Sequence, residues 1–179
     1  MTNLPQTYLF VPGNRSERFA KAAACGAHAV ILDLEDAVAP EQKVDAREAV
    51  ERWLSNRPAG GVPSLVRIND ADSPWFEQEL EWLGRAKPDG VMMPKAEDPD
   101  LLRNVARLLP AQCAFVPLVE TARGVAAARE IAAVPGVQRL AFGTIDYALD
   151  LDLPDDERGL IYPASVLAIE SRRAGLAAP

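Results

Sequence analysis

Two carboxylates end segments of the sequence that are expected to be strands, and a helix is expected to begin directly after the first of them. Glu120 ends the apolar run 115–119, and Asp146 closes the segment RLAFGTID at 139–146. A carboxylate pair that faces one cavity suits a hard divalent cation, because Mg²⁺ usually takes one or two protein carboxylates plus water and substrate oxygens. Helix capping or a salt bridge would explain either residue alone, so it is the pair that favours a magnesium site.

Arg67 is the cation best suited to an anionic substrate. It lies in the run SLVRIN at 64–69, and its planar guanidinium can hold a carboxylate through two parallel hydrogen bonds. A structural ion pair is an equally good interpretation, with Asp33, Glu35 or Asp36 as the partner. The sequence leaves both roles open for this arginine.

Two further cations stand beside expected strands. Lys95 ends the run GVMMPK at 90–95, where pairing with Glu97 or Glu35 is the alternative to a ligand contact. Arg15 stands where the first helix is expected to begin, and a cation there opposes the helix dipole, which favours an anionic partner. A solvated surface position is the alternative for Arg15.

The elements that must position these residues alternate along the chain. Strands are expected at 8–11, 29–34, 64–69, 90–95, 115–119 and 139–146, with helical segments between them. The residues at the expected strand ends, Asp36, Asn69, Lys95, Glu120 and Asp146, are 33, 26, 25 and 26 positions apart. This alternation predicts an all-parallel sheet, and ligands bind at the carboxyl ends of such strands.

Cap signals predict where several of the helices begin. Ser73 and Asp98 are each followed by proline, a pattern typical of a helix N-terminus, and the hydroxyl of Thr121 can cap the helix after the fifth strand. A last helix is expected at 162–174, and a seventh strand could begin near Leu176. The acidic run 150–157 lacks the spacing of a calcium-binding loop, so a solvated loop is expected there.

The parallel sheet could be an open doubly wound sheet or a closed barrel. Glycine-rich phosphate-binding signatures are absent, since the first turn reads PGNRSER, and this favours a TIM-type (β/α)8 barrel. Its mouth would gather the polar residues at the strand ends, namely Arg15, Glu35, Asp36, Arg67, Asn69, Lys95, Glu120 and Asp146. Eight such units need on the order of 250 residues. We therefore expect one incomplete barrel domain over 1–179, truncated after about six strand-helix units.

Composition excludes several classes of protein. A net charge of −7 argues against a nucleic-acid surface, and no apolar run approaches the ~18 residues of a membrane span. The amino terminus lacks a secretory pattern, so cytoplasmic residence is expected. Cys25 and Cys113 are expected to be reduced thiols, and one histidine is too few for an ordinary zinc site.

Six ordered motifs carry a family resemblance. The segments YLFVPGNRSERFAKA, AVILDLEDAV, LVRIN, VMMPKAE, PLVETARGV and AFGTIDYALDL together resemble the citrate lyase beta-subunit-like branch of the HpcH/HpaI aldolase superfamily. The resemblance runs from Thr7 to Pro179. It implies a TIM-type barrel whose Mg²⁺ is held by Glu120 and Asp146, with Arg67 contacting the substrate carboxylate.

The resemblance also implies an activity and partners. Members cleave or form a carbon-carbon bond, commonly on a CoA or acyl-carrier thioester of the citryl-, malyl- or citramalyl-CoA kind, and they form homo-oligomers, trimers or hexamers. They continue for two further strand-helix units and often lend a carboxyl-terminal segment with a catalytic acid to a neighbouring subunit. This sequence stops before those units, so it is expected to be a fragment or to be closed by association.

The chemistry can also be argued from the residues. Breaking a bond beta to a carbonyl leaves an enolate, and a cation between Glu120 and Asp146 would stabilise its charge as a Lewis acid. Arg67, Glu120, Arg15 and Lys95 are the expected substrate contacts, with Glu35, Asp36 and Asn69 around them. The alternatives are a metal-dependent aldolase acting on free oxo-acids and a catalytically silent subunit that binds only ligand or partners.

Overall fold

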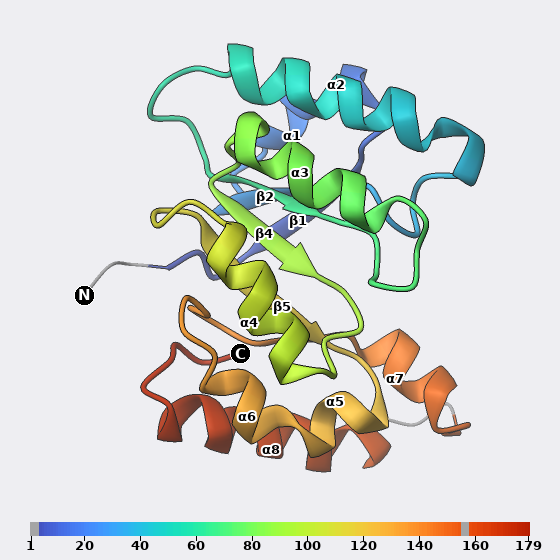
Figure 1. The fold of residues 1–179 in the computed structure, drawn as a ribbon, viewed down its shortest axis with the longest axis vertical. Helices are drawn as coiled ribbons and strands as arrows, with labels where there is room; N and C mark the ends of the chain where they lie inside the picture. Colours follow the sequence, from blue (N-terminus) through green and yellow to red (C-terminus); the bar gives the residue numbers. More distant parts are fainter. Residues whose placement is uncertain (1–3, 155–157) are drawn as a thin grey trace. The chain divides into compact units, whose positions relative to one another are not determined.

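The computed structural model describes residues 4–154 and 158–179. Contacts divide the chain into two compact units, Met1–Met92 and Met93–Pro179, and each is described by itself (Figure 1). The expectation of a single barrel domain over 1–179 stays a prediction. No helix in the described part of the chain is both long and apolar enough to cross a membrane.

The first unit is built on parallel strands in sequence order. They are β1 (Tyr8–Pro12), β2 (Ala29–Asp33), β3 (Ser64–Arg67) and β4 (Gly90–Met93), the last residue of which belongs to the second unit. β2 pairs with β1 and β3, and β3 also pairs with β4, with Arg67 opposite both Asp33 and Met92. This order differs from the 3-2-1-4 arrangement of an open doubly wound sheet, in which β3 would not pair with β4.

Helices follow β1, β2 and β3, because neighbouring parallel strands need a crossover connection, which is usually a helix. They are η1 (Ser16–Arg18), α1 (Phe19–Ala23), η2 (Pro40–Gln42), α2 (Lys43–Asn56) and α3 (Phe76–Ala86). All five residues of β2 are buried, as an apolar run in a parallel sheet predicts. α3 begins at Phe76, because Ser73 closes a turn by accepting the Trp75 N–H at 3.3 Å, so the predicted helix start at Ser73 is wrong.

The second unit continues the alternation of strands and helices. It contains α4 (Pro99–Leu108), β5 (Ala114–Val119), α5 (Ala122–Ala126), α6 (Ala128–Ala132), β6 (Ala141–Phe142), α7 (Thr144–Asp150) and α8 (Arg158–Arg173). β5 and β6 are parallel, with Val119 opposite Phe142. The predicted caps are confirmed: Asp98 accepts the N–H groups of Asp100 and Leu101, and Thr121 accepts that of Gly124 at 3.0 Å.

The end of the chain differs from expectation. The predicted strand 139–146 is a strand only at Ala141–Phe142, because Gly143 donates the last ladder hydrogen bond to Val119 O and then accepts the Tyr147 N–H as α7 begins. Asp146 therefore lies in the first turn of α7 and not at a strand end. α8 starts four residues earlier than predicted, and the described residues after it form no seventh strand. Residues 155–157 of the acidic run lie outside the described residues.

Candidate active site

Arg67 ends β3 at the centre of a carboxylate cluster in the first unit. Its Nε and Nη2 donate to the two oxygens of Asp33 at 2.7 and 2.6 Å, and Nη1 lies 2.8 Å from Glu35 Oε2 and 3.4 Å from Asp36 Oδ2. The Phe10 ring lies 5.1 Å from Cζ, in cation-π range. The structure thus shows the ion-pair role of Arg67, with all three of the carboxylates that the sequence suggested.

The charge state of Arg67 follows from these contacts. Burial alone would lower its pKa, but the hydrogen bonds and charge of Asp33, together with Glu35 and Asp36, raise the pKa above the ordinary arginine value. Asp33 is 1% exposed and also accepts the N–H groups of Glu35 and Ala37, which orders the turn after β2. Asp33 is therefore the principal anchor of Arg67, a role that the sequence offered only as one of three possibilities.

Asn69 belongs to a buried polar network that the sequence did not reveal and that reaches the backbone of Glu35. Lys43 Nζ donates to Leu34 O at 2.7 Å, Glu35 O at 2.8 Å and Asn69 Oδ1 at 2.7 Å. Asn69 in turn donates its backbone N–H and Nδ2 to the carboxylate of Glu79, at 2.8 and 2.7 Å. Burial lowers the pKa of Lys43 and raises that of Glu79. The network ties the turn after β2 to the end of β3, and so fixes the backbone that carries Glu35.

The sequence does contain a signal for Lys43 and Glu79, the two charged residues of this network that were not predicted. Lys43 shares a helical face with Ala46 and Val50, and Glu79 shares one with Phe76 and Leu83, and all of these residues are buried. A charged residue on an otherwise apolar helical stripe is unusual, because burial of a charge costs free energy unless partners satisfy it. Reading those stripes for charged members would have pointed to both positions.

Arg15 forms an ion pair with a residue close to it in the sequence. Its Nε donates to Glu17 Oε1 at 2.7 Å, and both side chains are about half exposed. The hydrogen bond from Arg15 lowers the pKa of Glu17. The anionic partner of Arg15 in this structure is therefore its neighbour in the first helical turn.

In the second unit, Glu120 is buried directly after β5. Its side chain accepts the backbone N–H of Lys95 at 2.8 Å, and the residue is 2% exposed. Lys95 adopts a left-handed backbone conformation (φ 45°) that aims this amide at Glu120. The structure therefore brings Lys95 and Glu120 together through the lysine backbone, and the lysine side chain stays exposed.

Gly143 brings the Glu120 carboxylate to the start of α7. A Cβ atom added at Gly143 would overlap with Glu120 Oε2, so the carboxylate lies directly against this residue. Asp146 follows three positions later in the first turn of the same helix, where Cβ atoms so spaced are about 5–6 Å apart. Glu120 and Asp146 are thus both placed at the amino-terminal end of α7.

The donor set at this place suits magnesium. Both residues offer carboxylate oxygens, and a carboxylate that accepts one N–H keeps further lone pairs for a cation. Within 4–154 and 158–179, no group of three or more His, Cys, Asp or Glu side chains is arranged to hold a metal ion. Two carboxylates leave most positions of an octahedral ion to water or substrate oxygens, which is the usual coordination of Mg²⁺.

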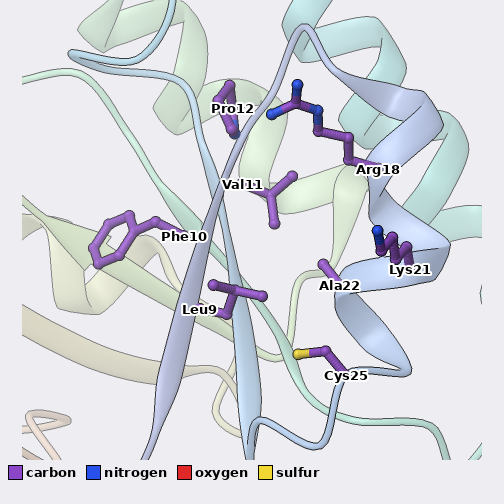
Figure 2. A pocket seen from close by; sticks show the side chains of 8 residues that line it. All are labelled: Leu9, Phe10, Val11, Pro12, Arg18, Lys21, Ala22 and Cys25. Atoms are coloured by element: carbon purple, nitrogen blue, oxygen red, sulfur yellow. The ribbon is translucent and has the colours of Figure 1, made fainter.

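A hollow of about 420 Å³ lies elsewhere in the first unit. Figure 2 shows its lining, which comes from β1 and from the segment around α1: Leu9, Phe10, Val11, Pro12, Arg18, Lys21, Ala22 and Cys25. Its wall on β1 includes the partly exposed side chains of Leu9 and Phe10. None of the residues predicted to bind substrate or metal lines this hollow.

Parallel strands that alternate with helices, with polar residues near the carboxyl ends of the strands, place the chain in the class of β/α proteins. The chain belongs to the HpcH/HpaI aldolase/citrate lyase family, whose model matches residues 6–178. It is 36% identical over 146 residues to (3S)-malyl-CoA thioesterase of Cereibacter sphaeroides, covering 82% of this chain and 51% of that protein. It is 37% identical over 186 residues to a citrate lyase subunit beta-like protein of Deinococcus radiodurans, covering 98% and 64%.

Solved structures agree with this assignment. The citrate lyase beta subunit of Mycobacterium tuberculosis complexed with oxaloacetate and magnesium matches with a TM-score of 0.79 and 33% identity, over 94% of this chain and 74% of that one. The same organism's CitE with magnesium, acetoacetate and coenzyme A gives 0.80 and 32%, over 97% and 65%. These matches confirm the family resemblance and the α/β fold of the TIM-type barrel class. The chain spans about half the length of the thioesterase that it matches.

Proposed function

We propose that the chain carries the magnesium- and substrate-binding part of a lyase that cleaves or forms a carbon-carbon bond in a 3-hydroxyacyl thioester of the citryl-, malyl- or citramalyl-CoA kind. The observation that carries this proposal is the placement of Glu120 and Asp146 at one end of α7. Family membership supports it, as do relatives solved with magnesium, oxo-acids and coenzyme A.

Each candidate residue has a proposed task. Glu120 and Asp146 hold Mg²⁺, which when bound supplies Lewis-acid stabilisation of negative charge on a carbonyl oxygen. Arg67 holds the substrate carboxylate, and Arg15 and Lys95 offer positive charge to its anionic groups. Glu35 and Asp36 lie around Arg67, and Asn69 helps to fix the backbone that carries Glu35. We also expect cytoplasmic residence and self-association, both from the sequence and the family resemblance.

Calorimetry with Mg²⁺ and pyruvate or oxaloacetate tests the metal site. Mg²⁺ should bind weakly alone and more tightly with the oxo-acid, because two protein ligands leave room for the chelating oxygens, and the enhancement must be mutual. Glu120→Gln and Asp146→Asn should abolish the oxo-acid-dependent part. Asp152→Asn, an exposed carboxylate in the same unit, is the matched control. If either site variant binds like wild type, the site assignment fails.

Thioester hydrolysis is a second candidate, because the relative from Cereibacter sphaeroides is named a thioesterase. The two reactions give different products from malyl-CoA. Carbon-carbon cleavage leaves the thioester intact and releases no thiol, whereas hydrolysis releases free coenzyme A. A thiol-reactive dye therefore separates them, and CoA dependence separates both from an aldolase that acts on free oxo-acids. A chain that binds Mg²⁺ and an oxo-acid but converts neither thioester nor oxo-acid would be a catalytically silent subunit.

A further inference from the structure

The three carboxylates around Arg67 differ in side-chain burial and in the length of their contacts with the guanidinium. The side chain of Asp33 is 1% exposed, contacts Arg67 at 2.6 and 2.7 Å, and accepts two backbone N–H groups as well. The side chain of Glu35 is 6% exposed and lies 2.8 Å from Nη1. The side chain of Asp36 is 63% exposed, and its single contact with Arg67 is 3.4 Å long. Asp36 is therefore the weakly held member of the cluster.

The N–H groups of Arg67 show where another anion could bind. A guanidinium has five N–H donors. Asp33 takes the one on Nε and one on Nη2, and Glu35 and Asp36 both lie against Nη1. Among the contacts of residues 4–154 and 158–179, none uses the second N–H of Nη2. Removal of Asp36 would leave Nη1 with Glu35 as its remaining carboxylate neighbour, so that Nη1 and Nη2 together could offer a carboxylate two N–H groups.

We propose that Asp36 is a displaceable competitor for the substrate carboxylate, which takes its place on Nη1 and adds the second N–H of Nη2, while Asp33 and Glu35 stay bound. This inference rests on the proposed role of Arg67 in substrate binding. Asp36 would then influence the affinity for substrate in addition to pairing with Arg67.

Of the carboxylates bound to Arg67, Asp36 has the lowest free-energy cost of displacement. The Asp36 side chain is 63% exposed and meets Arg67 at only 3.4 Å, so water solvates this carboxylate when the contact breaks, and the lost interaction is small. Displacing Asp33 would instead leave a buried carboxylate without its cation, which is strongly unfavourable. Phe10 of β1 lies against the guanidinium, and Asp36 is the exposed member of the cluster. A carboxylate ligand can therefore exchange with Asp36 at small cost and with no change at Asp33.

Pyruvate affinity in the presence of Mg²⁺ tests the proposal. Asp36→Asn keeps the size of the side chain but removes the competing charge, so the dissociation constant should fall by about two- to fivefold, the range of exposed ion pairs. The gain should shrink as salt screens the charges. Asp33→Asn should instead weaken binding. Asp45→Asn, an exposed aspartate on α2 of the same unit, should bind like wild type.

Unchanged or weaker pyruvate binding by Asp36→Asn, with wild-type folding by circular dichroism, overturns the inference while the proposed function stands. Retained Mg²⁺-dependent binding in Glu120→Gln overturns the metal site, yet tighter binding by Asp36→Asn would still support the inference. Absence of pyruvate binding in both wild type and Asp36→Asn overturns both. Competition with acetate gives a second readout, because Asp36→Asn should also bind this simple carboxylate more tightly.

Discussion

Gly143→Ala is the most direct test of how Glu120 is held. The backbone at Gly143 has φ −88° and ψ 90°, which alanine adopts without strain, so any effect comes from the new methyl group. That methyl would overlap with both Oε2 and Cβ of Glu120, the latter at 2.6 Å. Glu120 is buried and bonded to the Lys95 N–H, so its side chain cannot simply swing into water.

The expected magnitude follows from this overlap. An added methyl in a close-packed site costs about 1–3 kcal/mol of unfolding free energy. Relief of the clash must move the carboxylate of Glu120 away from Gly143, and therefore away from the end of α7 that carries Asp146. We expect both a lower urea midpoint and a loss of oxo-acid-dependent Mg²⁺ binding, measured on the same protein by denaturation and calorimetry.

Gly84→Ala is the matched control. Gly84 lies inside α3, and a Cβ atom there meets nothing within 4 Å, so the same substitution should stabilise the protein by about 0.5–1 kcal/mol through helix propensity. Its Mg²⁺ binding should be unchanged. Wild-type stability and wild-type Mg²⁺ binding in Gly143→Ala would refute the reasoning, because the carboxylate would then not depend on its contact with Gly143.

Two other predictions concern the first unit. Arg67→Lys keeps the charge but loses the planar fork, so oxo-acid affinity should fall by about tenfold or more while binding of Mg²⁺ alone is unaffected; equal losses would make Arg67 purely structural. Burial raises the pKa of Glu79 above 4.5, so its favourable contribution to stability is complete below that pH and is lost as pH rises through the folded-state pKa. Urea unfolding of wild type and Glu79→Gln across pH 4–8 should show wild type losing stability relative to the variant as pH rises, and a constant difference would contradict this.

The strands were predictable because each is an apolar run of a length that suits a buried parallel strand. Their ends were not, since the expected strands 64–69 and 90–95 run two residues past the observed ends of β3 and β4. Strand β6 shows the cause: the strand ends at Phe142, and FGTID has no feature that separates a strand end from the first turn of a helix. Asp146 was therefore identified as a candidate ligand and placed on the wrong element.

The hydrogen-bond partners within the polar network were beyond prediction for another reason. The contact between Lys43 and Asn69 joins residues 26 positions apart, and Lys43 also binds two backbone carbonyls that carry no side-chain signal. Backbone acceptors are the same at every residue, so no composition or spacing can identify them. The same limit applies to Glu120, which accepts the backbone N–H of Lys95.

For Arg67 the sequence offered an ion pair or a substrate contact, and the structure makes the two compatible. Five N–H donors can serve a permanent anchor and a ligand together, provided the anchor occupies one edge and leaves another exchangeable. Asp33 is buried and accepts from the edge of the guanidinium that carries Nε, whereas Asp36 is exposed and contacts Nη1. Arg67→Lys and Asp36→Asn should therefore shift oxo-acid affinity in opposite directions, an outcome that a purely structural ion-pair cluster would not give.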